Sequence, residues 1–171
     1  GDWIVRDDVF VRHQTKEEIK TGGLTVGFTG YGGNHHIGPE FQLGHLVGEA
    51  YEEPVLLIKT AWGGKSIHKD FRPPSSSGST GEFYKKMLTE YREGLAKIGD
   101  EFPQLAKRKP ELSGFVWFQG WNDLCCGGEY EPLLRALVAA RAEGGHARPG
   151  GARRSLAEPG AAAVVARGAR L

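Results

Sequence analysis

The chain has 171 residues, of which 39% are hydrophobic and 25% charged, a composition typical of one globular domain. Its formal net charge of +1 gives no attraction to nucleic acid or to an acidic membrane surface, so neither is expected as a partner. No segment approaches the roughly 20 apolar residues of a membrane span, and the first residues do not have the pattern of a signal peptide.

The N-terminal part, up to Pro54, contains one strand signal, one glycine-rich loop and one helix signal. Val9–His13 favours a short strand, and residues 27–38 hold five glycines, which predicts a loop with unusual backbone angles. Pro39 stands where a first helical turn would place it, and Pro54 ends the segment. Helical spacing is kept by Phe41, Leu43, Leu46, Val47 and Ala50.

The central part alternates buried strands and amphipathic helices. Val55–Thr60 is a nearly unbroken apolar run, as expected for a strand covered on both faces. A loop over Arg72–Gly81 precedes a helix from Glu82, and Gly114–Gly120 is a second buried strand followed by a helix over Tyr130–Ala139. This order predicts an α/β protein, with helix layers on both faces of a parallel sheet (α/β/α, flavodoxin-like) that is incomplete.

The C-terminal segment 141–171 differs in composition from the rest of the chain. Ala, Arg and Gly fill 21 of its positions, and it has no Lys, Asp or aromatic residue. It has a charge of +4 (6 basic, 2 acidic), against −3 (16 basic, 19 acidic) for residues 1–140. We therefore divide the chain into a domain over 1–140 and a tail over 141–171. The tail is expected to be disordered or the product of out-of-frame reading, outside the core.

Two strand ends carry the residues best suited to chemistry. Gly63-Gly64-Lys65-Ser66 follows the first buried strand, and Gln119-Gly120-Trp121-Asn122-Asp123 ends the second. Ligands bind at the carboxyl ends of strands in parallel α/β sheets, so we expect two neighbouring strands to deliver both segments to one pocket. A glycine N–H and a side-chain amide are both suited to stabilising an oxyanion, which makes Gly64 and Gln119 candidates.

Three ordered blocks resemble the sialate O-acetylesterase-like carbohydrate esterases of the SGNH-hydrolase superfamily. They are Gly38–Glu40, Glu53–Ser66 and Gly114–Asp123, and the similarity spans about residues 1–140. The resemblance implies a three-layer α/β/α fold, a Ser–His–Asp triad that removes acetyl groups from sugars, and no metal or cofactor. It also implies that Gly63, Gly64 and Gln119 form the oxyanion hole. Family habit points to secreted or periplasmic use, although the sequence itself leaves the localisation unknown.

The catalytic residues of that family are missing from this chain. No Gly-Gln-Ser-Asn block, which holds the nucleophile, and no Asp-x-x-His pair occurs, so we interpret the chain as a fragment without catalytic activity of its own. Ser66 matches a non-nucleophilic family position, and Glu143-Gly144-Gly145-His146 only imitates the Asp-x-x-His spacing. The family's Gln-Gly-Glu is Gln119-Gly120-Trp121 here, which puts the sugar preference in doubt.

Further residues near the two strand ends are candidates for the substrate pocket, namely Trp62, Trp121, Asn122 and Asp123. Asp123 is expected to cap the loop or helix that follows it. His35 and His36 could line a cleft, but no third ligand stands at a spacing suited to a metal, and solvated loop histidines are the preferred interpretation.

Three functions are compared. The first is a serine hydrolase acting on acetylated carbohydrate. The second is a carbohydrate-binding relative of that enzyme without catalysis. The third, a remote alternative, is a nucleotide binder, because Gly64-Lys65-Ser66 after a buried strand imitates a P-loop; Lys59 stands where the first glycine of that motif is needed. Oligomeric state and sugar specificity do not follow from the sequence.

Overall fold

The computed structural model describes residues 2–31, 35–144 and 161–169, with side chains not described at 125–126, 141–144 and 161–169. The elements in chain order are β1 (Val9–Gln14), β2 (Ile19–Gly23), α1 (Pro39–Ala50), β3 (Val55–Ala61), α2 (Glu82–Ala96), α3 (Ile98–Glu101), η1 (Pro103–Leu105), β4 (Lys109–Phe118), η2 (Trp121–Cys126), α4 (Gly127–Gly144) and β5 (Ala161–Ala169). The predicted strands and helices are therefore present, and β4 begins at Lys109 rather than at the predicted Gly114.

The strands form one mixed sheet in the order β2-β1-β3-β5-β4. β1 and β3 are parallel, with His13 opposite Lys59, whereas β2 is antiparallel to β1 and β5 is antiparallel to both β3 and β4. The predicted α/β class is confirmed, but the sheet is mixed and not the parallel sheet that was predicted. The short turn over residues 15–18 between β1 and β2 allows only an antiparallel hairpin, because a parallel connection needs a dozen or more residues.

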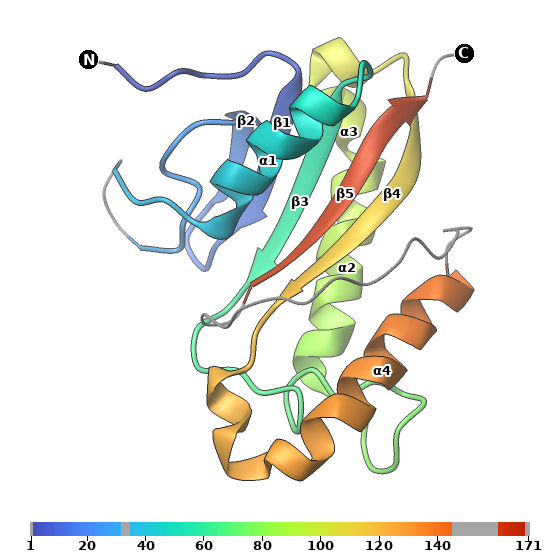
Figure 1. Ribbon diagram of the computed structural model, residues 1–171. Coiled ribbons are helices and arrows are strands. Elements are labelled where there is room, and N and C mark those ends of the chain that lie inside the picture. The colour runs from blue at the N-terminus through green and yellow to red at the C-terminus, as the bar shows by residue number, and fades with distance from the viewer. Residues whose placement is uncertain (1, 32–34, 145–160, 170–171) are drawn as a thin grey trace.

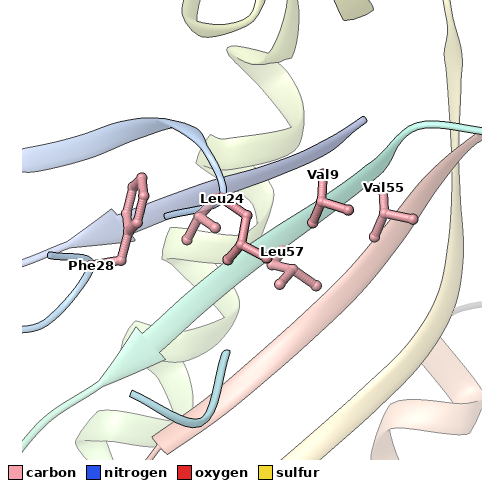
Figure 2. Packing of buried hydrophobic residues seen from close by; sticks show 6 residues of the cluster. Val9, Leu24, Phe28, Val55 and Leu57 are labelled. Carbon is pink, nitrogen blue, oxygen red and sulfur yellow. The ribbon is translucent and has the colours of Figure 1, made fainter. Parts of the chain in front are cut away.

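Helices cover both faces of this sheet. Alternate residues of β1 and β3 point to α1, where Val9, Val55 and Leu57 pack with Leu24 and Phe28 (Figure 2). The intervening residues face α2 and α3 on the other side (Figure 1), in a cluster made of Phe10, Leu56, Ile58, Phe102 and Leu105. Val55–Thr60 is buried throughout, which confirms the strand predicted to be covered on both faces.

Two glycines let α1 approach the sheet closely. A Cβ placed on Gly44 would lie 2.3 Å from Leu24 Cδ2, and one on Gly48 would lie 2.5 Å from Val9 Cγ2. Both distances are below any normal carbon contact, so a larger residue would push the helix outward. The helical spacing detected in the sequence therefore includes small residues as well as apolar ones.

The C-terminal segment differs from the expectation. Ala161–Ala169, within the predicted tail, pairs along its length with β3 on one side and with β4 on the other (Figure 1). The physical reason is that strand pairing uses backbone groups, and a run of Ala and Val without proline satisfies two strand edges without large side chains. The boundary at residue 140 and the origin of the tail stay predictions.

Candidate active site

The loops that follow β3 and β4 meet at the end of the sheet where both strands have their carboxyl ends. Gln119 Nε2 donates a hydrogen bond to the carbonyl oxygen of Lys65 at 3.0 Å, and Asn122 Nδ2 donates to the same oxygen at 3.2 Å. Lys65 directly follows Gly64, so the two predicted segments lie together. We expected β3 and β4 to be neighbouring strands, but β5 lies between them. The loops reach across that strand.

Asp123 holds the two loops together. Its side chain is 2% exposed, and its carboxylate accepts hydrogen bonds from the backbone N–H groups of Ile67 and His68, both at 2.9 Å. Its Oδ2 also accepts a bond from Gln119 Nε2 at 2.6 Å. The expectation that Asp123 caps the segment after it is therefore wrong for its carboxylate, which binds a turn much earlier in the chain, between β3 and α2.

The orientation of the Gln119 amide follows from its partners. Both Lys65 O and the Asp123 carboxylate accept hydrogen bonds only, so the amide nitrogen must face them and its two hydrogens are both used. Gln119 is 8% exposed, and its Oε1 has no hydrogen-bond partner among the described residues. In this arrangement Gln119 joins the loops, and its N–H groups are not free.

Tyr130 fixes the backbone next to Gln119. Its hydroxyl donates to the carbonyl oxygen of Gln119 and lies 3.3 Å from Trp117 Nε1, which donates to it. Burial raises the pKa of Tyr130, so the phenol stays protonated and remains a donor. Trp117, a partly buried residue of β4, thus packs against the core and links it to the site through Tyr130.

Gly63 and Gly64 form the open part of the site. Both are exposed, and no atom lies within 4 Å of a Cβ placed on either. Within the described part of the chain, the structure records no hydrogen bond from their N–H groups. Gly64 has a φ of +70°, which glycine adopts far more readily than other residues. Free backbone donors beside open space are what an oxyanion-binding loop requires.

Ser66 is committed to the turn that follows. Its hydroxyl donates to Asp70 Oδ2 at 3.2 Å and accepts the N–H of Lys69 at 3.2 Å, and its own N–H donates to Asp70 at 2.9 Å. No imidazole contacts this hydroxyl among the described residues. That Ser66 is not the nucleophile stays a prediction.

The P-loop alternative does not fit the geometry. A P-loop needs a helix that begins directly after Lys65-Ser66, but residues 62–81 form turns and the next helix begins at Glu82. The Lys65 amine lies 3.5 Å from Asp70 Oδ1 and 4.1 Å from the centre of the Phe83 ring. Its charge is therefore already compensated, and it does not extend into an empty phosphate cradle.

The candidate pocket tryptophans have different surroundings. The Trp62 ring packs against Phe71 and Phe83, with ring centres 5.8 and 5.2 Å away. The Trp121 side chain is 67% exposed. Trp121 therefore remains open to a ligand, whereas Trp62 belongs mainly to the packing between the loop and α2.

Sequence reasoning missed a second polar cluster, which joins β3 to Phe28 and to the start of α1. Lys59 Nζ donates to Glu40 Oε2 at 2.8 Å and to Phe28 O at 2.7 Å, and both charged residues are buried. Burial lowers the pKa of Lys59, while Glu40 opposes that shift. Burial, followed by the charge of Lys59, lowers the pKa of His13 to about 4. The available signal was a lysine inside an otherwise apolar strand.

A surface cluster near the start of α4 also escaped prediction. His68 Nδ1 lies 2.9 Å from Glu129 Oε2, and Arg72 Nη1 lies 3.6 Å from the same oxygen. These residues are far apart in the sequence, so no local pattern joins them. Within the described residues, no group of three or more metal-binding side chains is found, and no helix is long and apolar enough to cross a membrane.

The fold and the site define a mixed α/β protein with a loop junction at the carboxyl ends of two strands that run in the same direction. A family model described as carbohydrate esterase, sialic acid-specific acetylesterase, matches residues 13–140, about three quarters of the chain. The chain therefore belongs to this carbohydrate esterase family, which confirms the resemblance seen in the sequence. No curated protein and no solved structure matches the chain.

Proposed function

We propose that this chain carries the acyl-binding part of a serine hydrolase that removes acetyl groups from sugar esters. The N–H groups of Gly63 and Gly64 would stabilise the negative charge that develops on the acetyl carbonyl oxygen. The observation that carries the proposal is the hydrogen bond from Gln119 to Lys65 O at 3.0 Å, which joins the two loops beside these free N–H groups. Family membership supplies the substrate class, an acetylated carbohydrate.

Gln119 would complete the oxyanion hole by exchanging one partner. The carbonyl of Lys65 already accepts a second hydrogen bond from Asn122 at 3.2 Å, so losing the bond from Gln119 would leave it satisfied. The bond to Asp123 at 2.6 Å is charge-assisted and would hold the amide in place during the exchange. One N–H of Gln119 would then point at the substrate oxygen.

The chain alone is expected to have no acetylesterase activity. It has donors for the oxyanion but no activated nucleophile, and loss of the nucleophile costs about a millionfold in serine hydrolases. We expect turnover of 4-nitrophenyl acetate by the 171-residue chain to equal the uncatalysed background. Turnover above background that disappears in Ser66→Ala would instead identify Ser66 as the nucleophile and contradict the proposal.

The acyl-binding role is tested in the longer gene product. The locus is sequenced on both sides, and an in-frame product containing a Gly-Gln-Ser-Asn block is expressed. In that protein, Gln119→Leu should lower kcat for sugar acetate hydrolysis by about 10²–10³, the usual cost of one oxyanion donor. The control is Glu93→Gln, an exposed residue of α2 that contacts neither loop. Unchanged kcat in Gln119→Leu would remove Gln119 from the hole.

A non-catalytic carbohydrate-binding protein is the second candidate. It is favoured by the engagement of the Ser66 hydroxyl with Asp70, which leaves no free nucleophile at the loop. If the locus encodes no Gly-Gln-Ser-Asn block and no Asp-x-x-His pair, while the chain binds sugars, this function replaces the first.

A further inference from the structure

The short helix η2 has its polar and apolar sides reversed. Asp123 is buried, while the apolar side chains of Trp121 and Leu124 are 67% and 73% exposed. In a 3₁₀ helix, side chains three residues apart lie on the same side, so Trp121 and Leu124 form one apolar surface that faces solvent. Core packing does not explain this surface, because both side chains point away from the core.

Trp121 differs in this respect from the other tryptophans. Trp62 packs on Phe71 and Phe83, Trp117 packs on Phe71 with ring centres 5.1 Å apart, and Trp3 packs on Phe41 at 5.9 Å. Among the described residues, no ring contact is recorded for Trp121. Its indole is the one with both an exposed face and no aromatic partner in that part of the chain.

The surface formed by Trp121 and Leu124 lies beside the loop that holds Gly63 and Gly64. Asn122, the next residue after Trp121, donates its hydrogen bond to the carbonyl oxygen of Lys65, the next residue after Gly64. Trp121 and Gly64 are therefore each one residue, about 3.8 Å along the chain, from the two residues that this bond joins. A ligand in the open space at Gly64 would be within reach of the indole.

We propose that Trp121, with Leu124 beside it, is the stacking surface for the sugar ring of an O-acetylated pyranoside. A pyranose has an apolar C–H face and polar edges, and it packs on an indole through the C–H face while its hydroxyls stay in water. This inference rests on the proposed function, because the acetyl group of the same ligand would lie at Gly63 and Gly64. It also assigns a role to the Trp121 position, where the resemblance showed a departure from the family's glutamate.

The test measures sugar binding by the full 171-residue chain with NMR. The probes are the methyl glycoside of 9-O-acetyl-N-acetylneuraminic acid, its deacetylated parent, and ethyl acetate as an acetyl ester without a sugar. The indole N–H signals of the four tryptophans are followed, and each is assigned by Trp→Phe substitution. The variants are Trp121→Ala and Trp121→Phe, with Trp3→Phe as the matched control, because Trp3 packs on Phe41 and has no part in the site.

We expect both glycosides to shift the Trp121 signal and Trp121→Ala to raise both dissociation constants about tenfold, which corresponds to about 1.4 kcal/mol. Trp121→Phe should restore most of the affinity, and Trp3→Phe should leave it unchanged. Binding of ethyl acetate should not depend on Trp121. Absence of sugar binding, or equal affinity in Trp121→Ala, would overturn the inference.

Two outcomes separate this inference from the proposed function. If the acetylated and deacetylated glycosides bind equally and both depend on Trp121, the sugar surface stands while the acyl-binding role of the glycine loop fails. If Trp121→Ala changes the sedimentation of the chain but not its sugar affinity, the surface is a contact between copies of the chain, and the inference fails.

Discussion

Two buried carboxylates show how differently this protein treats the same kind of charge. Asp123 and Glu90 are both 2% exposed. Asp123 accepts hydrogen bonds from Ile67, His68 and Gln119, whereas neither carboxylate oxygen of Glu90 has a hydrogen-bond partner among the described residues. Burial raises the pKa of Glu90 to about 7, and the Lys86 amine, which opposes that shift, stays 4.0 Å from its Oε1.

Asp123 therefore positions the candidate site, whereas Glu90 in its charged form destabilises the folded chain. Donors at Asp123 balance the cost of removing its charge from water, and they fix the two loops relative to each other. Glu90 lies between α2 and the sheet without such donors, so its charged form is unfavourable in the folded chain. The comparison can be tested with variants that remove either property.

The largest effect is expected for Asp123→Ala. Two backbone N–H groups and the amide of Gln119 would lose their acceptor, and each unsatisfied donor costs about 1–3 kcal/mol, so the free energy of unfolding should fall by about 4 kcal/mol. Urea unfolding measures this change. The exposed Asp7→Ala serves as control, with a change within about 0.5 kcal/mol. A similarly small loss in Asp123→Ala would show that the loops do not depend on this carboxylate.

The next largest effect is expected for Glu90→Gln. The folded pKa of about 7 lies above the ordinary value of 4.5, so the stability linked to neutral Glu90 is complete below pH 4.5 and is lost as the pH rises through 7. At pH 8 the free energy of unfolding of the variant should exceed that of the wild type by up to about 3 kcal/mol, an upper limit set by the size of the pKa shift.

Urea unfolding at pH 5 and pH 8 checks the Glu90 prediction. The exposed Glu82→Gln on the same helix should leave the pH dependence of the wild type unchanged. If Glu90→Gln and the wild type lose the same stability between these pH values, Glu90 is not the group that titrates.

His13 should make the stability depend on pH less strongly than Glu90 does and in the opposite direction, because its contribution is lost as the pH falls. Its folded pKa of about 4 lies below the ordinary 6.5, so the stability linked to neutral His13 is present above 6.5 and is lost as the pH falls toward 4. At pH 5 the wild type should have lost about 2 kcal/mol relative to pH 8 through this group. His13→Leu should remove that loss in urea unfolding at both pH values. A loss that persists in the variant would assign the acid sensitivity to other residues.

The smallest effect is expected for Gly64→Ala. The φ of +70° costs a residue with a Cβ about 1 kcal/mol, while the space around the position is open. Gly63→Ala is a matched control, because Gly63 is equally open and does not have a positive φ. Thermal unfolding of the two variants should differ by a few degrees. Equal stability of the two would mean that the Gly64 backbone relaxes to an ordinary conformation.

Much of this structure could be predicted from residues close together in the chain. The apolar run Val55–Thr60 and the spacing from Glu82 onward identify β3 and α2, because burial on a strand or helix leaves a periodic pattern. The meeting of the loops that hold Lys65 and Gln119 followed from a general rule about strand ends. Family membership then followed from the same blocks.

The features that could not be predicted depend on partners distant in the sequence. Asp123 binds Ile67 and His68, although two α-helices, a 3₁₀ helix and a strand separate them in the sequence, and no local pattern encodes that pairing. β5 was missed because small residues form strands through their backbone, which leaves no hydrophobic signal. Glu90 was missed because it shares a helix with exposed charges and only the fold shows which of them faces inward.

The position of β5 sets the width of the sheet at the candidate site. One intervening strand separates β3 from β4 by about 10 Å, twice the normal interstrand spacing. Phe118 and Ala61 both lie opposite Ala161, so β3 and β4 end at the same level of the sheet. Both strands are antiparallel to β5 and therefore run in the same direction. A chain shortened to residue 140 would leave two facing strand edges with unpaired backbone groups. Direct parallel pairing of those edges would narrow the gap by half and bring Gly64 and Gln119 closer together.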